Sequence, residues 1–244
     1  MTGRFGLAAS DIQVVPVERL ELAFAPTVWP FALQRRAGID EHFAQLQRDK
    51  PQLWNGRVLL LHRFAVAGGV FRGAYLDTDF ASFIAWRDWD FPDPAVHNCF
   101  GMGALRAADG AFVLGRMGEH TANAGLIYFA CGTPDPSDVV GHTVDLAGSA
   151  LRELAEETGL AEQDFTAEAG WYTVLAGPRI AQMKILQAAE RADVLRARIL
   201  DHLARERQPE LADICIVRDA SDFDPRMPPF ITAFLRHVWD AETQ

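Results

Sequence analysis

The alternation of apolar and polar positions divides the chain into segments with strand or helix character. Residues 12–22 are rich in Val, Leu and Ile with some alternation, which indicates one or two strands. Residues 31–50 carry Ile39, Phe43 and Leu46 along one side, which predicts an amphipathic helix. The chain is therefore expected to begin with strands that a helix follows.

Two strand-like runs come next and flank a pair of glycines. Residues 57–66 and 70–76 surround Gly68 and Gly69, which predicts a β-hairpin. Residues 80–89 follow an Asp-Thr-Asp sequence that is typical of a helix N-cap, and their apolar spacing predicts a helix. A Pro-rich polar stretch then interrupts the pattern.

The second half of the chain repeats this change from strands to helices. Residues 99–106 and 112–117 flank an Asp-Gly pair, which is a strong hairpin signal. Residues 126–131 predict a third strand that leads into a long loop at 132–143, and residues 145–160 predict a helix. The remaining predicted elements are strands at 171–175, 180–186 and 214–217, a helix at 189–207, and a closing helix that starts at Pro228-Pro229.

Strands on both sides of a strand–loop–helix unit favour an α+β fold with a mixed sheet between helices. The Pro-rich stretch at 90–94 predicts a domain boundary. We therefore expect an N-terminal α/β extension at residues 1–92 and a main domain at residues 93–244. No internal repeat and no low-complexity segment is visible in the sequence.

The predicted helix at 145–160 carries three carboxylates on one side. Glu153 precedes Glu156 and Glu157 by three and four residues, and Arg152 precedes Glu156 by four. Like charges at this spacing destabilise a helix by roughly 0.2–0.5 kcal/mol per pair. A divalent cation such as Mg²⁺ or Mn²⁺ would turn that repulsion into attraction. The alternative interpretation is a solvated acidic face that Arg152 neutralises.

The whole string from Arg152 to Leu160 resembles the second half of the Nudix box, G-x5-E-x7-R-E-U-x-E-E-x-G-U, in which U is aliphatic. The resemblance implies an α/β/α sandwich and hydrolysis of a nucleoside diphosphate linked to another moiety. It also implies Mg²⁺ or Mn²⁺ held by Glu156 and Glu157, with Glu153 as a third ligand. The matching positions are Arg152, Glu153, Leu154, Glu156, Glu157, Gly159 and Leu160.

The first half of the box departs from this pattern. Val144 stands where the first glutamate belongs, and Asp138 stands where the glycine belongs. The nearest plausible glycine is Gly132, which lies about six residues further from Arg152 than the pattern specifies. The resemblance is therefore strongest in the helix half of the box.

The resemblance also implies roles for residues outside the box helix. The backbone carbonyl of Gly132 is a further candidate metal ligand, and Arg152 is expected to orient a glutamate through a salt bridge. Glu210, just before a predicted strand, is the expected later carboxylate, with Glu190 and Asp213 as rivals. An exposed surface carboxylate without a function is the alternative for all three.

Other residues are weaker candidates. Arg179 and Lys184 lie on a predicted strand, where they would contact a phosphate or the linked moiety, or else face solvent. His120 and His142 border the box loop. Trp86, Trp89 and Phe91 are candidates for stacking on a base or for the core, and Cys131 for a buried thiol or a nucleophile.

Composition narrows the partners. A net charge of −10 argues against nucleic acid as the main partner. Three widely spaced cysteines form no disulfide framework, which favours a reducing cytoplasm. No apolar run approaches the roughly 18 residues of a membrane span. The expected partner is a small nucleotide diphosphate derivative, and a homodimer is expected only by analogy with other Nudix proteins.

The resemblance to the Nudix box implies metal-dependent hydrolysis of a pyrophosphate bond in such a compound. The order strand, helix, Leu-Trp-Asn-Gly, hairpin and helix before the box resembles the UDP-sugar-hydrolysing branch of the family. Two alternatives stay open. One is a catalytically weak Nudix-fold nucleotide-binding or sensor module, which Val144 and the long loop motivate. The other is a CoA-ester or capped-RNA hydrolase with the same fold.

Overall fold

The computed structural model describes residues 11–243, which form two compact units. The sequence predicted one boundary, after residue 92, whereas each unit contains more than one stretch of chain. The first unit consists of the described residues up to Glu18, Phe100–Gly132 and the described residues from Leu146 onward. The second unit consists of Arg19–Cys99 and Thr133–Asp145.

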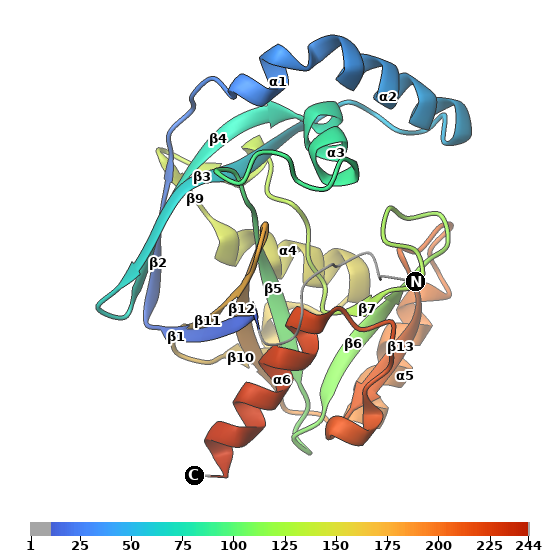
Figure 1. The fold of residues 1–244 in the computed structure, drawn as a ribbon. Helices are drawn as coiled ribbons and strands as arrows, with labels where there is room; N and C mark the ends of the chain where they lie inside the picture. The colour runs from blue at the N-terminus through green and yellow to red at the C-terminus, as the bar shows by residue number, and fades with distance from the viewer. Residues whose placement is uncertain (1–10, 244) are drawn as a thin grey trace. The chain divides into compact units, whose positions relative to one another are not determined.

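The first unit is built on sheet A, whose strand order is β1-β11-β12-β5-β6-β13, with β10 beside β12 and β7 beside β6 (Figure 1). Its strands are β1 (Gln13–Val17), β5 (Asn98–Arg106), β6 (Phe112–Met117), β7 (Ile127–Tyr128), β10 (Phe165–Ala167), β11 (Trp171–Ala176), β12 (Arg179–Ala188) and β13 (Leu211–Val217). Its helices are α4 (Leu146–Thr158), α5 (Ala192–Leu203) and α6 (Pro229–Glu242), with short 3-10 helices at Glu162–Asp164 and Ala220–Asp222.

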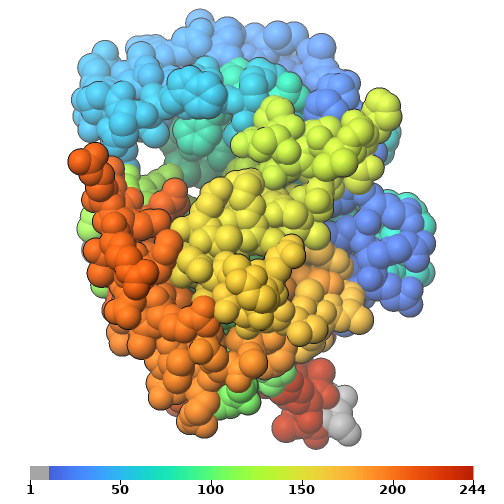
Figure 2. All heavy atoms as spheres, turned by 180° about the vertical axis from the view of Figure 1, so that it is seen from behind, coloured from blue at the N-terminus to red at the C-terminus, as the bar shows by residue number. Residues whose placement is uncertain are grey.

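Helices cover both faces of sheet A. On one face Gly101 of β5 lies against α4, so close that a Cβ there would come within 3.2 Å of the Ala150 Cβ. Figure 2 shows α4 (yellow) and α5 (orange) side by side. On the other face, the ring of Phe234 in α6 lies 6.0 Å from Phe112 and 5.6 Å from Tyr172. The predicted α/β/α layering is confirmed.

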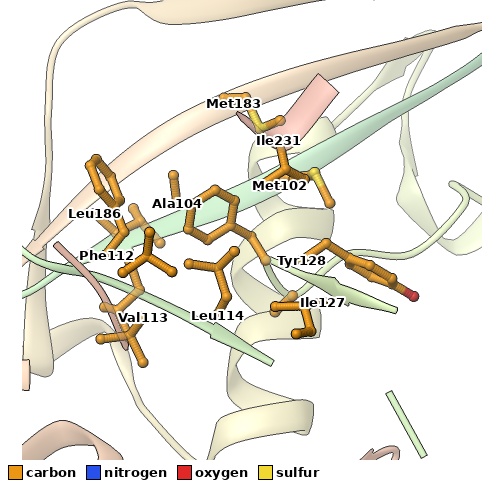
Figure 3. Packing of buried hydrophobic residues seen from close by; sticks show 14 of the residues in the cluster. Met102, Ala104, Phe112, Val113, Leu114, Ile127, Tyr128, Met183, Leu186 and Ile231 are labelled. Atoms are coloured by element: carbon orange, nitrogen blue, oxygen red, sulfur yellow. The ribbon is translucent and has the colours of Figure 1, made fainter. Parts of the chain in front are cut away.

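Apolar side chains of the strands and helices meet in one continuous core in this unit. Figure 3 shows Met102, Phe112, Leu114 and Met183 gathered there, and all four are fully buried. The hairpin between β5 and β6 turns at Gly110, whose φ of 81° favours glycine, as the Asp-Gly signal predicted. Leu154 of α4 belongs to this core, so the core fixes the helix that carries the candidate site.

The second unit is built on sheet B, whose strand order is β3-β4-β2-β9-β8. The sheet is mixed, because β2 runs parallel to β4, while β2–β9, β3–β4 and β8–β9 pair antiparallel. Its strands are β2 (Arg19–Phe24), β3 (Arg57–Ala67), β4 (Val70–Asp79), β8 (Val139–Val140) and β9 (Thr143–Val144). Its helices are α1 (Pro30–Gln34), α2 (Arg36–Asp49) and α3 (Phe80–Asp88), with a 3-10 helix at Pro136–Asp138.

Local sequence signals account for much of this unit. Gly68 and Gly69 take φ values of 58° and 71° at the tip of the predicted β3–β4 hairpin. Asp79 caps α3 by accepting a hydrogen bond from the Ser82 N–H at 2.8 Å. The single helix expected at 31–50 is divided at Arg35 into α1 and α2. Across residues 11–243, no helix has both the length and the apolar character that crossing a bilayer requires.

The extra length of the box loop forms structure of its own. Strands β8 and β9 pair around Gly141, whose φ is 64°, and Thr143 of β9 pairs with Ala23 of β2. Val144 is buried in β9, with 2 % of its surface exposed. The residue at the position of the first box glutamate is therefore a buried apolar residue.

Candidate functional site

Helix α4 positions the candidate carboxylates in the first unit. Ala150 and Leu154, four residues apart, are buried against sheet A. Glu153 and Glu157 follow the same spacing, each three residues after one of these apolar positions, and so flank the buried stripe. Gly159 ends the helix with a φ of 70°, the left-handed conformation that a helix C-terminus favours.

Glu157 is the most buried carboxylate of the helix. Only 5 % of the residue is exposed, and neither carboxylate oxygen has a hydrogen-bond partner. Burial raises the pKa of Glu157 to about 8, and the charges of Glu210 and Glu153 contribute to the rise. The backbone N–H of Cys131 is near enough to lower this pKa in part, but it does not reach hydrogen-bonding geometry with either carboxylate oxygen. Burying a carboxyl group without a hydrogen-bond donor costs free energy. A bound ligand or ion that interacts with Glu157 would offset this cost.

Glu153 packs against Gly132. A Cβ at residue 132 would lie 2.5 Å from Glu153 Oε1, so no side chain fits there while the carboxylate keeps this position. Arg152 donates a hydrogen bond from Nη1 to the same oxygen at 2.9 Å. Burial raises the pKa of Glu153, while Arg152 offsets part of that rise. Gly132 and Glu153, both predicted from the sequence, are thus in direct contact.

Glu156 lies on the outer side of the helix. Its side chain is 62 % exposed, and its Oε2 is 3.5 Å from Arg152 Nη1. Arg152 therefore pairs with both Glu153 and Glu156, and its orienting role at a metal site stays a prediction. The structure separates the two glutamates that the resemblance treats alike: Glu157 is buried and Glu156 faces solvent.

Glu210 approaches the cluster from the start of β13. Its backbone carbonyl accepts a hydrogen bond from the Gly118 N–H at 2.7 Å, which fixes it beside the end of β6. Its charge contributes to the raised pKa values of Glu157 and Glu153. The two rivals are engaged elsewhere, because Asp213 pairs with Arg196 at 3.0 Å and Glu190 pairs with Arg198.

The two predicted substrate-binding cations lie on β12. The Nζ of Lys184 donates a hydrogen bond to the Gly170 carbonyl at 2.9 Å and lies 5.1 Å from the centre of the Trp171 ring. Arg179 begins the strand, opposite Ala176 of β11. Their roles in binding phosphate stay predictions.

Of the two candidate histidines, His120 is in the first unit. A Cβ on Gly118 would lie 3.0 Å from His120 Cε1 and 3.0 Å from the carbonyl oxygen of Glu210. The imidazole of His120 and the backbone of Glu210 therefore both pack against Gly118. His142 belongs to the second unit, where its carbonyl accepts a hydrogen bond from the Phe24 N–H at 2.9 Å.

The remaining candidates are structural. Trp86 is fully buried, donates from Nε1 to the Asp93 carbonyl at 3.0 Å and packs edge-on against Phe91. Trp89 packs against Phe31 in the same aromatic core of the second unit. In the first unit, burial raises the pKa of the Cys131 thiol well above its usual value, which disfavours the thiolate that a nucleophile needs.

Sequence reasoning missed Tyr128. Its hydroxyl oxygen accepts a hydrogen bond from Asn123 Nδ2 at 3.0 Å, and burial raises its pKa, to which the charges of Glu157 and Glu210 contribute. The signal that could have found it is its position four residues before Gly132, in the run that leads to the box loop.

The donor set fits a hard divalent cation. Throughout residues 11–243, no three Asp, Glu, His or Cys side chains are already arranged as a coordination group. The two oxygens of Glu157 nevertheless lack partners, and the charges of Glu153 and Glu210 act on them. Carboxylate and carbonyl oxygens are the ligands that Mg²⁺ and Mn²⁺ prefer. The residues present are therefore suitable for such an ion.

Comparisons with known proteins give distant likenesses. No family model matches the sequence, and no curated protein does. The structure is similar to a Nudix hydrolase from M. smegmatis, RenU, with a TM-score of 0.39 and 16 % identity over 60 % of this chain and 86 % of that one. It is also similar to the MutT protein from Methanosarcina mazei Go1, with a TM-score of 0.39 and 15 % identity over 61 % of this chain and 96 % of that one. Likenesses at this level carry no argument about activity, which rests on the residues of the site.

Proposed function

We propose that this chain is a Nudix-type hydrolase that uses a divalent cation to cleave a pyrophosphate bond in a nucleoside diphosphate linked to another moiety. The observation that carries the proposal is the state of Glu157, buried beside Glu153 and Glu210 with both carboxylate oxygens lacking a hydrogen-bond donor. A carboxylate that only stabilised the fold would have a donor or be replaced by an apolar residue. A cation would supply the missing partner.

Each residue of the site has a separate role in this proposal. Glu157, Glu153 and Glu210 would hold the cation, with the Gly132 carbonyl as a further ligand. When bound, Mg²⁺ or Mn²⁺ neutralises phosphate charge and makes a water more acidic. Arg152 keeps the Glu153 carboxylate against Gly132 through its hydrogen bond. Glu156 remains at the solvent-exposed rim.

Charge explains why the activity should require the ion. The protein carries a net charge of −10, and the site itself gathers carboxylates. An anionic nucleotide would be repelled by this field without a cation between it and the glutamates. We therefore expect no turnover in the presence of a chelator such as EDTA, and only weak nucleotide binding under the same conditions.

Within this substrate class we propose a UDP-sugar as the first compound to test. Support comes from the order of elements in the second unit, which resembles the UDP-sugar-hydrolysing branch. The cytoplasm is the proposed location, in keeping with free thiols at Cys99, Cys131 and Cys215. A homodimer stays a prediction by analogy.

The test is product release from a panel of nucleotides with Mg²⁺ or Mn²⁺ and with EDTA. The panel holds UDP-glucose, ADP-ribose, NADH, diadenosine polyphosphates, CoA and nucleoside triphosphates. Metal-dependent cleavage of one of them supports the proposal, and the products name the linked moiety. Cleavage of the whole panel at equal rates in EDTA would contradict it.

A second candidate function is a nucleotide-binding or sensor module without turnover. The observation that favours it is Val144, which is buried in β9 where the box pattern has a glutamate. Tight binding of a nucleotide by the wild-type chain, with no product at any metal concentration, would favour the module over the hydrolase.

A further inference from the structure

Tyr128 is the last residue of β7 in sheet A. It pairs with Gly115 of β6, which on its other side pairs with Ile214 of β13. Two residues further along, Ala130 borders the same small void as Leu154 of α4. The segment that follows Tyr128 leads to Gly132, which lies against Glu153, and the charges of Glu157 and Glu210 act on the Tyr128 phenol, so this side chain lies beside the carboxylates.

The O–H group of Tyr128 is available as a hydrogen-bond donor. Asn123 Nδ2 donates to the hydroxyl oxygen at 3.0 Å, so this bond uses an acceptor site of the phenol and leaves its O–H available as a donor. Figure 3 shows the hydroxyl at the end of the ring that points away from the apolar cluster. Burial raises the pKa of Tyr128 far above neutrality, so the phenol remains protonated under physiological conditions.

One loop fixes both Asn123 and the backbone of Glu210. The loop after β6 closes on itself through the Leu126 N–H to the Asn123 carbonyl at 3.1 Å and the Gly125 N–H to the Met117 carbonyl at 3.0 Å. Its first residue, Gly118, holds the Glu210 carbonyl at 2.7 Å. The donor and a carboxylate of the cluster are therefore positioned by the same element.

Neutral donors have a specific use at such a site. The carboxylates repel a phosphate, and the Arg152 guanidinium beside them is engaged with Glu153 and Glu156. The carboxylate oxygens of Glu157 accept no hydrogen bond, so the Tyr128 O–H does not donate to that carboxylate. A phosphate oxygen of a bound substrate is the acceptor that fits.

We propose that Tyr128, held in place by Asn123, donates a hydrogen bond to a phosphate oxygen of the substrate beside the Glu157 cluster. This inference rests on the proposed function, and it adds a substrate-binding residue that lies outside the box helix. Hydrogen bonds to charged groups contribute about 1.5–3 kcal/mol, which corresponds to roughly 10- to 100-fold in affinity or rate.

The first test replaces the hydroxyl alone. Tyr128→Phe keeps the ring and should lower kcat/KM and the affinity for inorganic pyrophosphate in the presence of Mg²⁺, each by about 10- to 100-fold. Its thermal midpoint and its affinity for Mn²⁺ should stay at the wild-type values. Tyr172→Phe is the matched control, because that hydroxyl belongs to a ring packed on α6, and all four quantities should be unchanged.

The second test gives the Tyr128 O–H a different hydrogen-bond acceptor. Asn123→Asp replaces the amide donor with a carboxylate that accepts from Tyr128, so it should weaken pyrophosphate binding while the phenol is still present. Wild-type pyrophosphate affinity in both Tyr128→Phe and Asn123→Asp would overturn the inference. An equal loss of Mn²⁺ affinity in Tyr128→Phe would also overturn it, because the residue would then act on the metal ligands.

The inference and the proposed function can fail separately. If the wild-type chain binds Mn²⁺ and pyrophosphate but cleaves no nucleotide, the hydrolase proposal fails. The pyrophosphate affinities of the variants then still decide whether Tyr128 is the donor. If the wild-type chain binds neither Mn²⁺ nor pyrophosphate, both proposals fall.

Discussion

Glu157 should destabilise the metal-free protein as pH rises, and Glu157→Gln should remove this effect. The folded-state pKa is raised from 4.5 to about 8. The contribution of Glu157 to folding is therefore most favourable below about pH 4.5, where this group is protonated in both states. The free energy of unfolding should fall as pH rises toward 8 and then level off.

The magnitude follows from the size of the shift. Each pKa unit corresponds to about 1.4 kcal/mol, so a rise from 4.5 to about 8 sets a ceiling of about 5 kcal/mol. A typical domain has a free energy of unfolding of roughly 5–15 kcal/mol, so the loss is large enough to measure. Glutamine has nearly the same shape and no charge, so it isolates the ionisation of this one side chain.

The assay is urea denaturation of both proteins in EDTA between pH 5 and pH 9.5. Because the other titrating groups are common to both, the difference in unfolding free energy reports on Glu157. The variant should be close to the wild type at pH 5 and more stable by several kcal/mol at pH 9. Saturating Mn²⁺ should then stabilise the wild type more than the variant. A difference that does not change with pH would refute the reasoning.

Three further substitutions test the geometry of the site. Gly132→Ala should lower Mn²⁺ affinity and kcat by about tenfold or more, because its Cβ would lie 2.5 Å from Glu153 Oε1; unchanged values in a Mn²⁺ titration and an activity assay would contradict the packing. Gly159→Ala should lower the free energy of unfolding by about 1–3 kcal/mol, because φ is 70° and the Cβ would lie 2.5 Å from His202 Nδ1; a thermal melt at the wild-type midpoint would argue against it. Val144→Glu restores the box residue but buries a carboxylate in β9, so we expect a lower thermal midpoint without a gain in Mn²⁺ affinity; tighter Mn²⁺ binding would show that this strand does reach the ion.

Local signals in the sequence predicted many elements, and long-range pairing accounts for most differences. The hairpin at Gly68-Gly69 and the cap at Asp79 depend on neighbouring residues, so pattern and turn chemistry were sufficient to find them. The pairing of Thr143 with Ala23 joins strands more than a hundred residues apart, and no local pattern specifies it. The predicted strand at 126–131 shortens to Ile127–Tyr128 before the chain bends toward α4.

The candidate site shows the same division. The spacing of residues 152–160 identified the carboxylates, because an i, i+4 relation places side chains on one side of any helix. Which glutamate is buried depends on how α4 packs, and the stripe of Ala150 and Leu154 places Glu157 inward and Glu156 outward. Tyr128 gave no motif, since its role depends on the register of β7 against β6.

The most direct test of the central claim is the rate of pyrophosphate cleavage by the wild type, Glu157→Gln and the surface control Glu162→Gln, with Mn²⁺ and with EDTA. The substrate is whichever nucleotide of the panel the wild type cleaves best. We predict turnover by the wild type and the control only with the metal, and a loss of at least about a hundredfold in Glu157→Gln. Equal rates in all three proteins, or turnover that persists in EDTA, would show that the cluster around Glu157 is not the catalytic centre.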